Sequence, residues 1–202
     1  MKVLKHLGAL WLAFTGLGFA GGDTRAPAPS SMVEPLFIEA CHDGDTCEGR
    51  TSLGARKTLR FRGIDAPEVS HGRKMGQRFG PEAREFVRRR LVGKTVYVEY
   101  QGVDVFARNL ALLWDSLEVR RQGAASVNEA LVAEGLAFAY RNRRSRPMKL
   151  PWAERAEAEA LKNRRGFWAV AEEARPVDPS EFRKQGRNLA PKKDFSSARR
   201  RN

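Results

Sequence analysis

The chain contains 202 residues, of which 42% are apolar and 30% are charged, and this composition excludes disordered and fibrous classes of protein. Lys and Arg outnumber Asp and Glu by 37 to 24, and the net charge of +13 favours a polyanionic partner such as nucleic acid or an anionic membrane surface. Two cysteines cannot form a four-cysteine zinc site, and the three histidines fit no zinc-hydrolase spacing.

Residues 1–20 have the pattern of an export signal, with basic residues ahead of an apolar run and small residues before a cleavage point at Ala20. A membrane anchor is the alternative, but the apolar run of roughly 14 residues is shorter than the ~20 that cross a bilayer. We therefore expect a periplasmic or secreted protein with a solvated linker over residues 21–33. After cleavage of the signal we expect no stable membrane partner.

Alternating apolar residues predict strands in the first half of the body, which we place at residues 34–174. In the stretch 57–64, for example, Leu59 and Phe61 face one side and Arg60 the other. The same reasoning predicts strands at 36–41, from Thr46, at 95–100 and at 110–114, with 117–120 as a hairpin partner of the last.

Three helices have recognisable ends in the sequence. Pro81 stands at the first turn of one helix, Ser126 and Glu129 form a capping box for the second, and Pro151 begins the third, which ends before Gly166. About five strands with three helices in this order predict an α+β fold, a five-stranded β-barrel of the oligonucleotide-binding (OB) type.

The C-terminal segment 175–202 is rich in Lys and Arg and has few sizeable apolar side chains. A segment with so little surface to bury is expected to be disordered. It would act either as a solubilising tail or as a nonspecific clamp on nucleic acid, and the sequence leaves both alternatives open.

Carboxylates gather in two short segments, at Asp43 and Asp45 and again at Asp65 and Glu68. Carboxylates that converge repel one another, and a hard divalent cation such as Ca²⁺, which takes oxygen ligands, relieves that repulsion. The alternative is that both segments are ordinary turns, since Asp, Gly and Pro are typical turn residues.

Two arginines, Arg60 and Arg108, lie on strands that approach these segments. A half-buried guanidinium needs an anionic partner, and its planar fork fits two phosphate oxygens. Together with a metal bound by carboxylates, such groups are suited to phosphoryl chemistry. The alternative is that both arginines form structural ion pairs with Asp or Glu.

Cys41 and Cys47 flank the Asp43–Asp45 turn symmetrically. If the segment is a hairpin, the two residues face each other at a distance that a disulfide spans, and an exported protein meets oxidising conditions. A Cys41–Cys47 disulfide would hold the turn rigid. Two buried free thiols are the alternative.

The chain resembles the staphylococcal (micrococcal) nuclease family, or thermonucleases, from about Glu34 to Trp168. The similarity rests on a series of ordered motifs: D-G-D-T at 43–46, R-x4-D-x-P-E at 60–68, G-P-E-A at 80–83, D-x3-R at 104–108, V-N-E-A-L-V at 127–132 and G-L-A at 135–137. Several motifs in order make the resemblance far more specific than any one of them.

The resemblance implies a five-stranded barrel with three helices that hydrolyses phosphodiester bonds of DNA and RNA with Ca²⁺, leaving 3′-phosphate and 5′-hydroxyl ends. It implies that Asp45, Asp65 and the backbone carbonyl of Ala66 bind the metal. By the same likeness Glu68 activates or orients the attacking water. The remaining two matched residues, Arg60 and Arg108, would hold the phosphate and stabilise its transition state.

The chain departs from the family pattern at Phe106 and Ala107, where the family has D-x-Y-G-R, so that a tyrosine hydroxyl and a glycine are missing. Tyr140 matches a tyrosine that contacts the nucleotide. The basic run that follows it would track phosphates beside a stacking aromatic ring, with Arg141, Arg143 and Arg144 as substrate-binding residues. A rim aromatic followed by a solvated basic loop is the alternative.

We therefore expect a monomeric nuclease acting on DNA and RNA. The first rival is a noncatalytic nucleic-acid-binding module of the same fold, which would have lost the acidic and arginine positions that this chain keeps. The second is a basic protein anchored by residues 1–20 whose tail binds anionic lipid or DNA.

Overall fold

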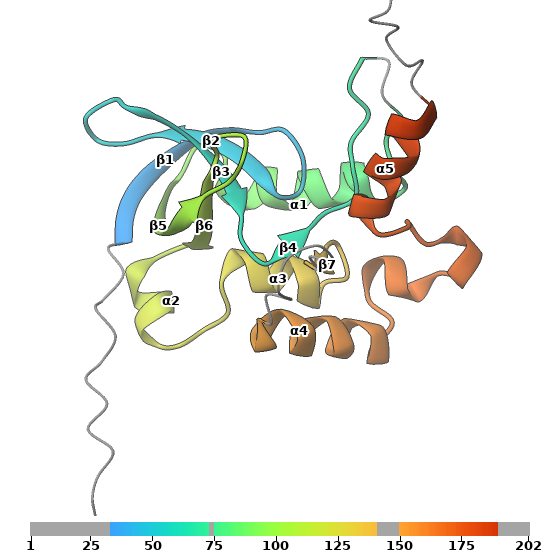
Figure 1. Ribbon diagram of the computed structural model, residues 1–202. Coiled ribbons are helices and arrows are strands. Elements are labelled where there is room, and N and C mark those ends of the chain that lie inside the picture. The colour runs from blue at the N-terminus through green and yellow to red at the C-terminus, as the bar shows by residue number, and fades with distance from the viewer. Residues whose placement is uncertain (1–32, 73–74, 141–149, 190–202) are drawn as a thin grey trace, which may run out of the picture. The chain divides into compact units, whose positions relative to one another are not determined.

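The computed structural model describes residues 33–72, 75–140 and 150–189, which belong to the compact unit Ser31–Asn202 (Figure 1). The expected signal at 1–20, almost all of the linker at 21–33, and residues 190–202 lie outside the described residues. So do Arg141, Arg143 and Arg144, which were predicted to bind substrate.

Five strands form the closed barrel that the sequence predicts, in the order β1-β2-β3-β6-β5. Their bounds are β1 Val33–Cys41, β2 Thr46–Arg50, β3 Arg56–Phe61, β5 Thr95–Val103 and β6 Asn109–Trp114. Four of the pairings are antiparallel, and the parallel pairing of β3 with β6 closes the barrel. A separate two-residue ladder joins β4, Ile64–Asp65, to β7, Phe138–Ala139 (Figure 1).

The alternation of apolar residues along the strands fills the barrel with side chains. The largest fully buried side chains from these strands are Leu36, Ile38, Leu59, Phe61, Val96, Val98 and Leu113. Helix α1, Gly80–Leu91, adds its own buried face of Ala83, Val87 and Leu91 to this core. The predicted start of α1 at a proline is confirmed.

Asn128, from the V-N-E-A-L-V motif, ties helix α3, Val127–Ala133, to the barrel. Its side chain is fully buried, and its Oδ1 accepts a hydrogen bond from Leu113 N at 3.1 Å. Its Nδ2 donates to the carbonyl oxygens of Arg62 at 3.0 Å and Ala111 at 2.9 Å. Asn128 therefore satisfies three backbone groups that would otherwise be buried without partners, which is a structural role.

Helix α4, Pro151–Lys162, packs against α3 (Figure 1). The Ser126 half of the capping box predicted for α3 is present, since Ser126 Oγ accepts a hydrogen bond from Glu129 N at 3.1 Å. The described chain has two further helices beyond the three expected, α2 (Leu117–Arg121) and α5 (Pro179–Leu189). Two 3₁₀ turns follow α4, at Gly166–Ala169 and Glu172–Ala174. No helix in the described segments is both long and apolar enough to span a bilayer.

The prediction of a strand at 117–120 is wrong, because Leu117–Arg121 forms helix α2. Ser116 Oγ accepts a hydrogen bond from Val119 N at 3.1 Å and caps the first turn. The apolar alternation over four residues was too short to distinguish a strand from a helical turn.

The expectation of disorder is also wrong for residues 175–189, where Pro179–Leu189 forms helix α5. Asp178 caps this helix, since its Oδ1 accepts hydrogen bonds from Ser180 N at 2.9 Å and from Ser180 Oγ at 2.5 Å. The segment makes polar contacts with the rest of the fold and buries two prolines, Pro176 and Pro179. Composition alone does not reveal such contacts.

Candidate active site

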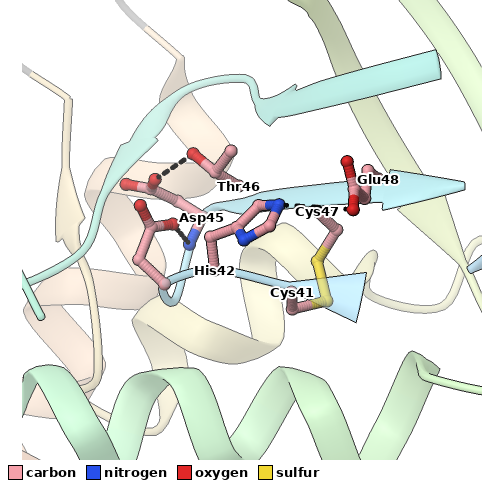
Figure 2. The surroundings of a disulfide bond; sticks show 7 residues. Cys41, His42, Asp45, Thr46, Cys47 and Glu48 are labelled. Carbon is pink, nitrogen blue, oxygen red and sulfur yellow. Dashed lines mark hydrogen bonds and ion pairs between the residues drawn. A yellow bond between two sulfur atoms is a disulfide. The ribbon is translucent and has the colours of Figure 1, made fainter. Parts of the chain in front are cut away.

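The turn between β1 and β2 carries the first carboxylates, and a disulfide closes its base (Figure 2). Cys41 and Cys47 pair across the two strands and are bonded, with their Cα atoms 4.0 Å apart. Within the turn, Asp43 Oδ1 accepts a hydrogen bond from Asp45 N at 3.0 Å. A Cβ on Gly44 would lie 2.7 Å from the Cβ of Ala83 and 2.8 Å from that of Ala66. Only glycine lets the turn approach α1 so closely.

Arg60 lies between the carboxylates of Asp45 and Asp65. The ladder between β2 and β3 sets Thr46 opposite Arg60, which brings Asp45 within reach of the guanidinium. Arg60 Nη1 forms an ion pair with Asp45 Oδ2, and Arg60 Nη2 donates to Asp65 Oδ1 at 2.7 Å. Asp45 Oδ2 also accepts a hydrogen bond from Ala66 N at 2.7 Å. All three side chains are nearly buried, with exposed fractions of 10% or less.

Burial dominates the electrostatics of the two aspartates. It raises the pKa of Asp45 from its ordinary 3.8 to about 6, and the Arg60 charge only partly opposes this effect. Burial likewise raises the pKa of Asp65, against the opposing charge of Arg60. Burial alone would lower the pKa of Arg60, but the two aspartates outweigh it and raise that pKa. Burial therefore disfavours the ionised form of both aspartates.

Glu68 stands on the loop after β4, and Gln77 fixes the backbone of that loop. Gln77 Oε1 accepts a hydrogen bond from Glu68 N at 3.0 Å, and Gln77 N donates to Glu68 O at 2.8 Å. A Cβ on Gly80 would lie 2.3 Å from Glu68 O, so this loop also packs closely against the start of α1. The side chain of Glu68 is 29% exposed and lines the same pocket as Asp45.

Arg108 approaches this pocket from the turn between β5 and β6. Its Nε donates to Asp104 Oδ2 at 2.8 Å, and its Nη1 lies 3.4 Å from Thr46 Oγ1, which in turn donates to Asp45 Oδ1. Partial burial opposes ionisation of Asp104, but hydrogen bonds from the backbone and side chain of Arg108 and from Phe106 N keep its pKa below the ordinary value. Asp104 therefore stays ionised and orients Arg108.

The pocket brings together most of the residues singled out in the sequence. Its lining residues include Asp43, Asp45, Arg60, Glu68, Arg108 and Tyr140, and the exposed side chains of Val105 and Phe106 stand at its edge. Asp65 reaches it through its contact with Arg60. Carboxylates and guanidinium groups in one pocket can bind a phosphodiester and a cation at the same time.

The donor atoms suit a hard cation. Asp45, Asp65 and the Ala66 carbonyl offer oxygen only, which is the ligand type that Ca²⁺ takes, and the raised pKa of Asp45 marks a place where added positive charge is favourable. Within the described residues no cluster of three His, Cys, Asp or Glu side chains is already arranged around a metal position. The oxygen ligands are of the type that the cation takes, and in this structure guanidinium nitrogens of Arg60 contact the two carboxylates.

Comparison with known sequences agrees with this geometry. The profile of the family described as "Staphylococcal nuclease homologue" matches residues 58–170, more than half of the chain. The chain belongs to the staphylococcal nuclease family.

Three curated proteins that are similar to this chain have names that describe nucleases. The chain is 33% identical over 131 residues to a protein named "Thermonuclease" from Staphylococcus hyicus, covering 63% of this chain and 71% of that one. It is 29% identical over 143 residues to an "Uncharacterized endonuclease" of Haemophilus influenzae, covering 71% and 69%. It is 31% identical over 133 residues to "Probable endonuclease LCL3" of Komagataella phaffii, covering 63% of this chain and 55% of that one.

The departures from the staphylococcal nuclease pattern have visible structural consequences. Ala107, where the family has glycine, adopts the left-handed conformation with φ of 60°, which strains a residue that carries a Cβ. Phe106, where the family has tyrosine, is 76% exposed, with the Arg108 guanidinium 5.5 Å from the centre of its ring. With these two departures, Arg108 still lines the pocket.

Sequence reasoning missed Arg183, which comes from α5. Its Nη2 donates to Asp65 Oδ2 at 2.6 Å, and its Nη1 donates to Glu68 Oε1 at 2.5 Å and to Asp65 Oδ1 at 3.1 Å. Burial alone would lower the pKa of Arg183, but the two carboxylates raise it. The Asp178–Glu181 capping pattern could have signalled the helix, but nothing local signals its contact with Asp65.

Proposed function

We propose that this nuclease hydrolyses phosphodiester bonds of DNA and RNA with Ca²⁺ as its cofactor. The observation that carries the proposal is the pocket in which Asp45, Glu68 and two arginines meet, with the buried Asp65 joined to it through Arg60. The strongly basic chain supports a nucleic-acid substrate, since the charge attracts phosphates whatever their sequence. The nuclease names of the relatives support the same reaction class.

Asp45, Asp65 and the Ala66 carbonyl are the residues that would hold the cation. When bound there, a hard divalent cation polarises a phosphate oxygen and neutralises the charge that grows on it in the transition state. The tight packing of Gly44 against Ala83 and Ala66 keeps the first and last of these ligands on fixed backbone. A rigid ligand set of this kind costs little reorganisation during the reaction.

Glu68 is the residue proposed to take the proton of the attacking water. Its side chain is partly exposed, so water can reach it, and its backbone is held on both sides by Gln77. Attack of the water oxygen on phosphorus with loss of the 5′ oxygen would leave a 3′-phosphate and a 5′-hydroxyl. Glu68 would thereby act as the general base.

Arg60 and Arg108 are proposed to bind the phosphoryl oxygens. Arg108, at 29% exposed, faces the pocket and is oriented by the ionised Asp104. Arg60 presents its guanidinium from the barrel wall. Charge-assisted hydrogen bonds from two guanidinium groups stabilise a phosphorane-like transition state more than the less charged diester.

We propose further that the chain is exported as a monomer, to the periplasm or the medium. The signal pattern at residues 1–20 supports export, and so does the disulfide at Cys41, which persists in oxidising compartments.

The test is hydrolysis of single- and double-stranded DNA and of RNA by the purified chain in Ca²⁺, in Mg²⁺ and in excess EGTA. We expect turnover in Ca²⁺ and none in EGTA, with Glu68→Ala and Arg108→Ala each slower by about 10³-fold but little changed in substrate binding. Turnover that survives excess EGTA would contradict the metal assignment. Binding without turnover under every condition would favour the noncatalytic alternative.

A further inference from the structure

We propose that helix α5 is a built-in competitor of the catalytic cation, with the Arg183 guanidinium on the Asp65 and Glu68 carboxylates until the cation displaces it. This inference rests on the proposed function, because it concerns the carboxylates assigned to the metal and to the water. It adds a regulatory segment to the chain, outside the matched family region of 58–170.

Arg183 bonds both carboxylate oxygens of Asp65. Oδ1 and Oδ2 accept hydrogen bonds from Arg183 at 3.1 Å and 2.6 Å, and Oδ1 also accepts one from Arg60 at 2.7 Å. Arg183 at the same time bonds Glu68 Oε1. A Ca²⁺ ion would lie about 2.3–2.6 Å from an Asp65 oxygen, beside two guanidinium charges, so repulsion favours the withdrawal of one of them.

Arg183 is the group free to withdraw. Arg60 is 10% exposed and lies inside the barrel wall between two aspartates, so moving it would leave buried charges unpaired. The Arg183 side chain is 38% exposed and stands on a C-terminal helix. Withdrawal would return its charge to solvent and free both Asp65 and Glu68.

A short polar attachment holds α5 over the site. Gln77 Nε2 donates to Val177 O at 2.7 Å, and Arg78 Nη1 donates to Ala174 O at 3.3 Å. Gln77 also bonds the backbone of Glu68, so the loop that carries Glu68 is itself the docking point of the strap formed by residues 174–189. The strap also buries Pro176 and Pro179, so these contacts dock it, while the Arg183 side chain beyond them stays partly exposed and can move locally.

The test is calcium binding to the full chain without substrate, measured by isothermal titration calorimetry. Arg183→Ala is expected to bind Ca²⁺ about tenfold more tightly or better, since a charge-assisted pair no longer has to be broken. Lys184→Ala, which removes the same charge from the neighbouring position but pairs only with Glu181, should match the wild type within about twofold. Asp178→Ala, which removes the cap of α5 without touching the carboxylates, should shift affinity in the same direction as Arg183→Ala.

Asp65→Asn separates the two hypotheses. If Asp65→Asn abolishes binding but Arg183→Ala binds no more tightly than the wild type, the competition is refuted and the metal site stands. If Asp65→Asn binds as the wild type does, or no variant binds Ca²⁺, the metal assignment fails and the competition with it. Thermal unfolding of each variant without Ca²⁺ identifies any loss of the fold.

Discussion

The raised pKa of Asp45 predicts an unusual dependence of metal-free stability on pH. The carboxyl titrates at about 6 in the folded protein and ordinarily at 3.8. Between these values the folded state retains a proton that the unfolded state has lost. Stability therefore falls as pH rises through this window, by 1.36 kcal/mol per unit, or about 3 kcal/mol in all.

The effect is best isolated by difference, because other carboxylates also titrate: Asp65, whose pKa is raised, with the same sign and others with the opposite sign. The pKa of Asp104, for instance, is lowered, so its contribution grows as pH rises above its folded value. Asp45→Asn removes this titration together with the charge that raises the pKa of Asp65. The free energy of unfolding of the wild type minus that of Asp45→Asn should fall by about 2–2.5 kcal/mol from pH 4 to pH 7.

The assay is urea unfolding of metal-free protein followed by tryptophan fluorescence at intervals across this pH range. Saturating Ca²⁺ should abolish or reverse the trend in the wild type, because the cation binds the ionised form of Asp45. A difference that is independent of pH, or that rises with pH, would refute the argument that burial outweighs the Arg60 ion pair.

Three further predictions concern structure around the site. Ala107→Gly should stabilise the protein by about 0.5–1 kcal/mol, because glycine adopts the left-handed conformation without strain. The control is Ala124→Gly at an exposed position outside the left-handed region, which should give no stabilisation. Equal effects of the two substitutions in thermal unfolding would contradict this. Asn128→Ala should destabilise the fold by about 2–4 kcal/mol because three buried backbone groups lose partners, and a loss below about 1 kcal/mol would mean that water replaces the side chain. Reduction of Cys41–Cys47 should lower stability by about 2 kcal/mol and weaken Ca²⁺ binding by loosening the Asp45 turn, and calorimetry that finds affinity unchanged would limit the disulfide to stability alone.

Much of the candidate site could be inferred from residue type and position. Asp45 and Asp65 stand at the ends of strands, where carboxylates remain accessible to one another, and the structure joins them through Arg60. The ion-pair alternative for Arg60 is confirmed, since it pairs with both aspartates, and its role as a phosphate ligand stays a prediction. The same holds for Arg108, which pairs with Asp104.

The barrel could be predicted from the sequence because the signals that mark its strands and helices lie within short segments of the chain. A strand shows its buried face every second residue, and a helix end shows a cap or a proline within one turn, so short windows suffice for β3, α1 and α3. Arg183 could not be found in this way. Its partners Glu68 and Asp65 lie 115 and 118 residues away in the sequence. No sequence motif in its helix indicates which part of the chain the helix contacts. An ion pair between residues so far apart in sequence depends on the folded barrel, which fixes the positions of both carboxylates. The contact of Arg183 with the pocket is therefore decided by the tertiary structure and is not encoded in any single segment of the chain.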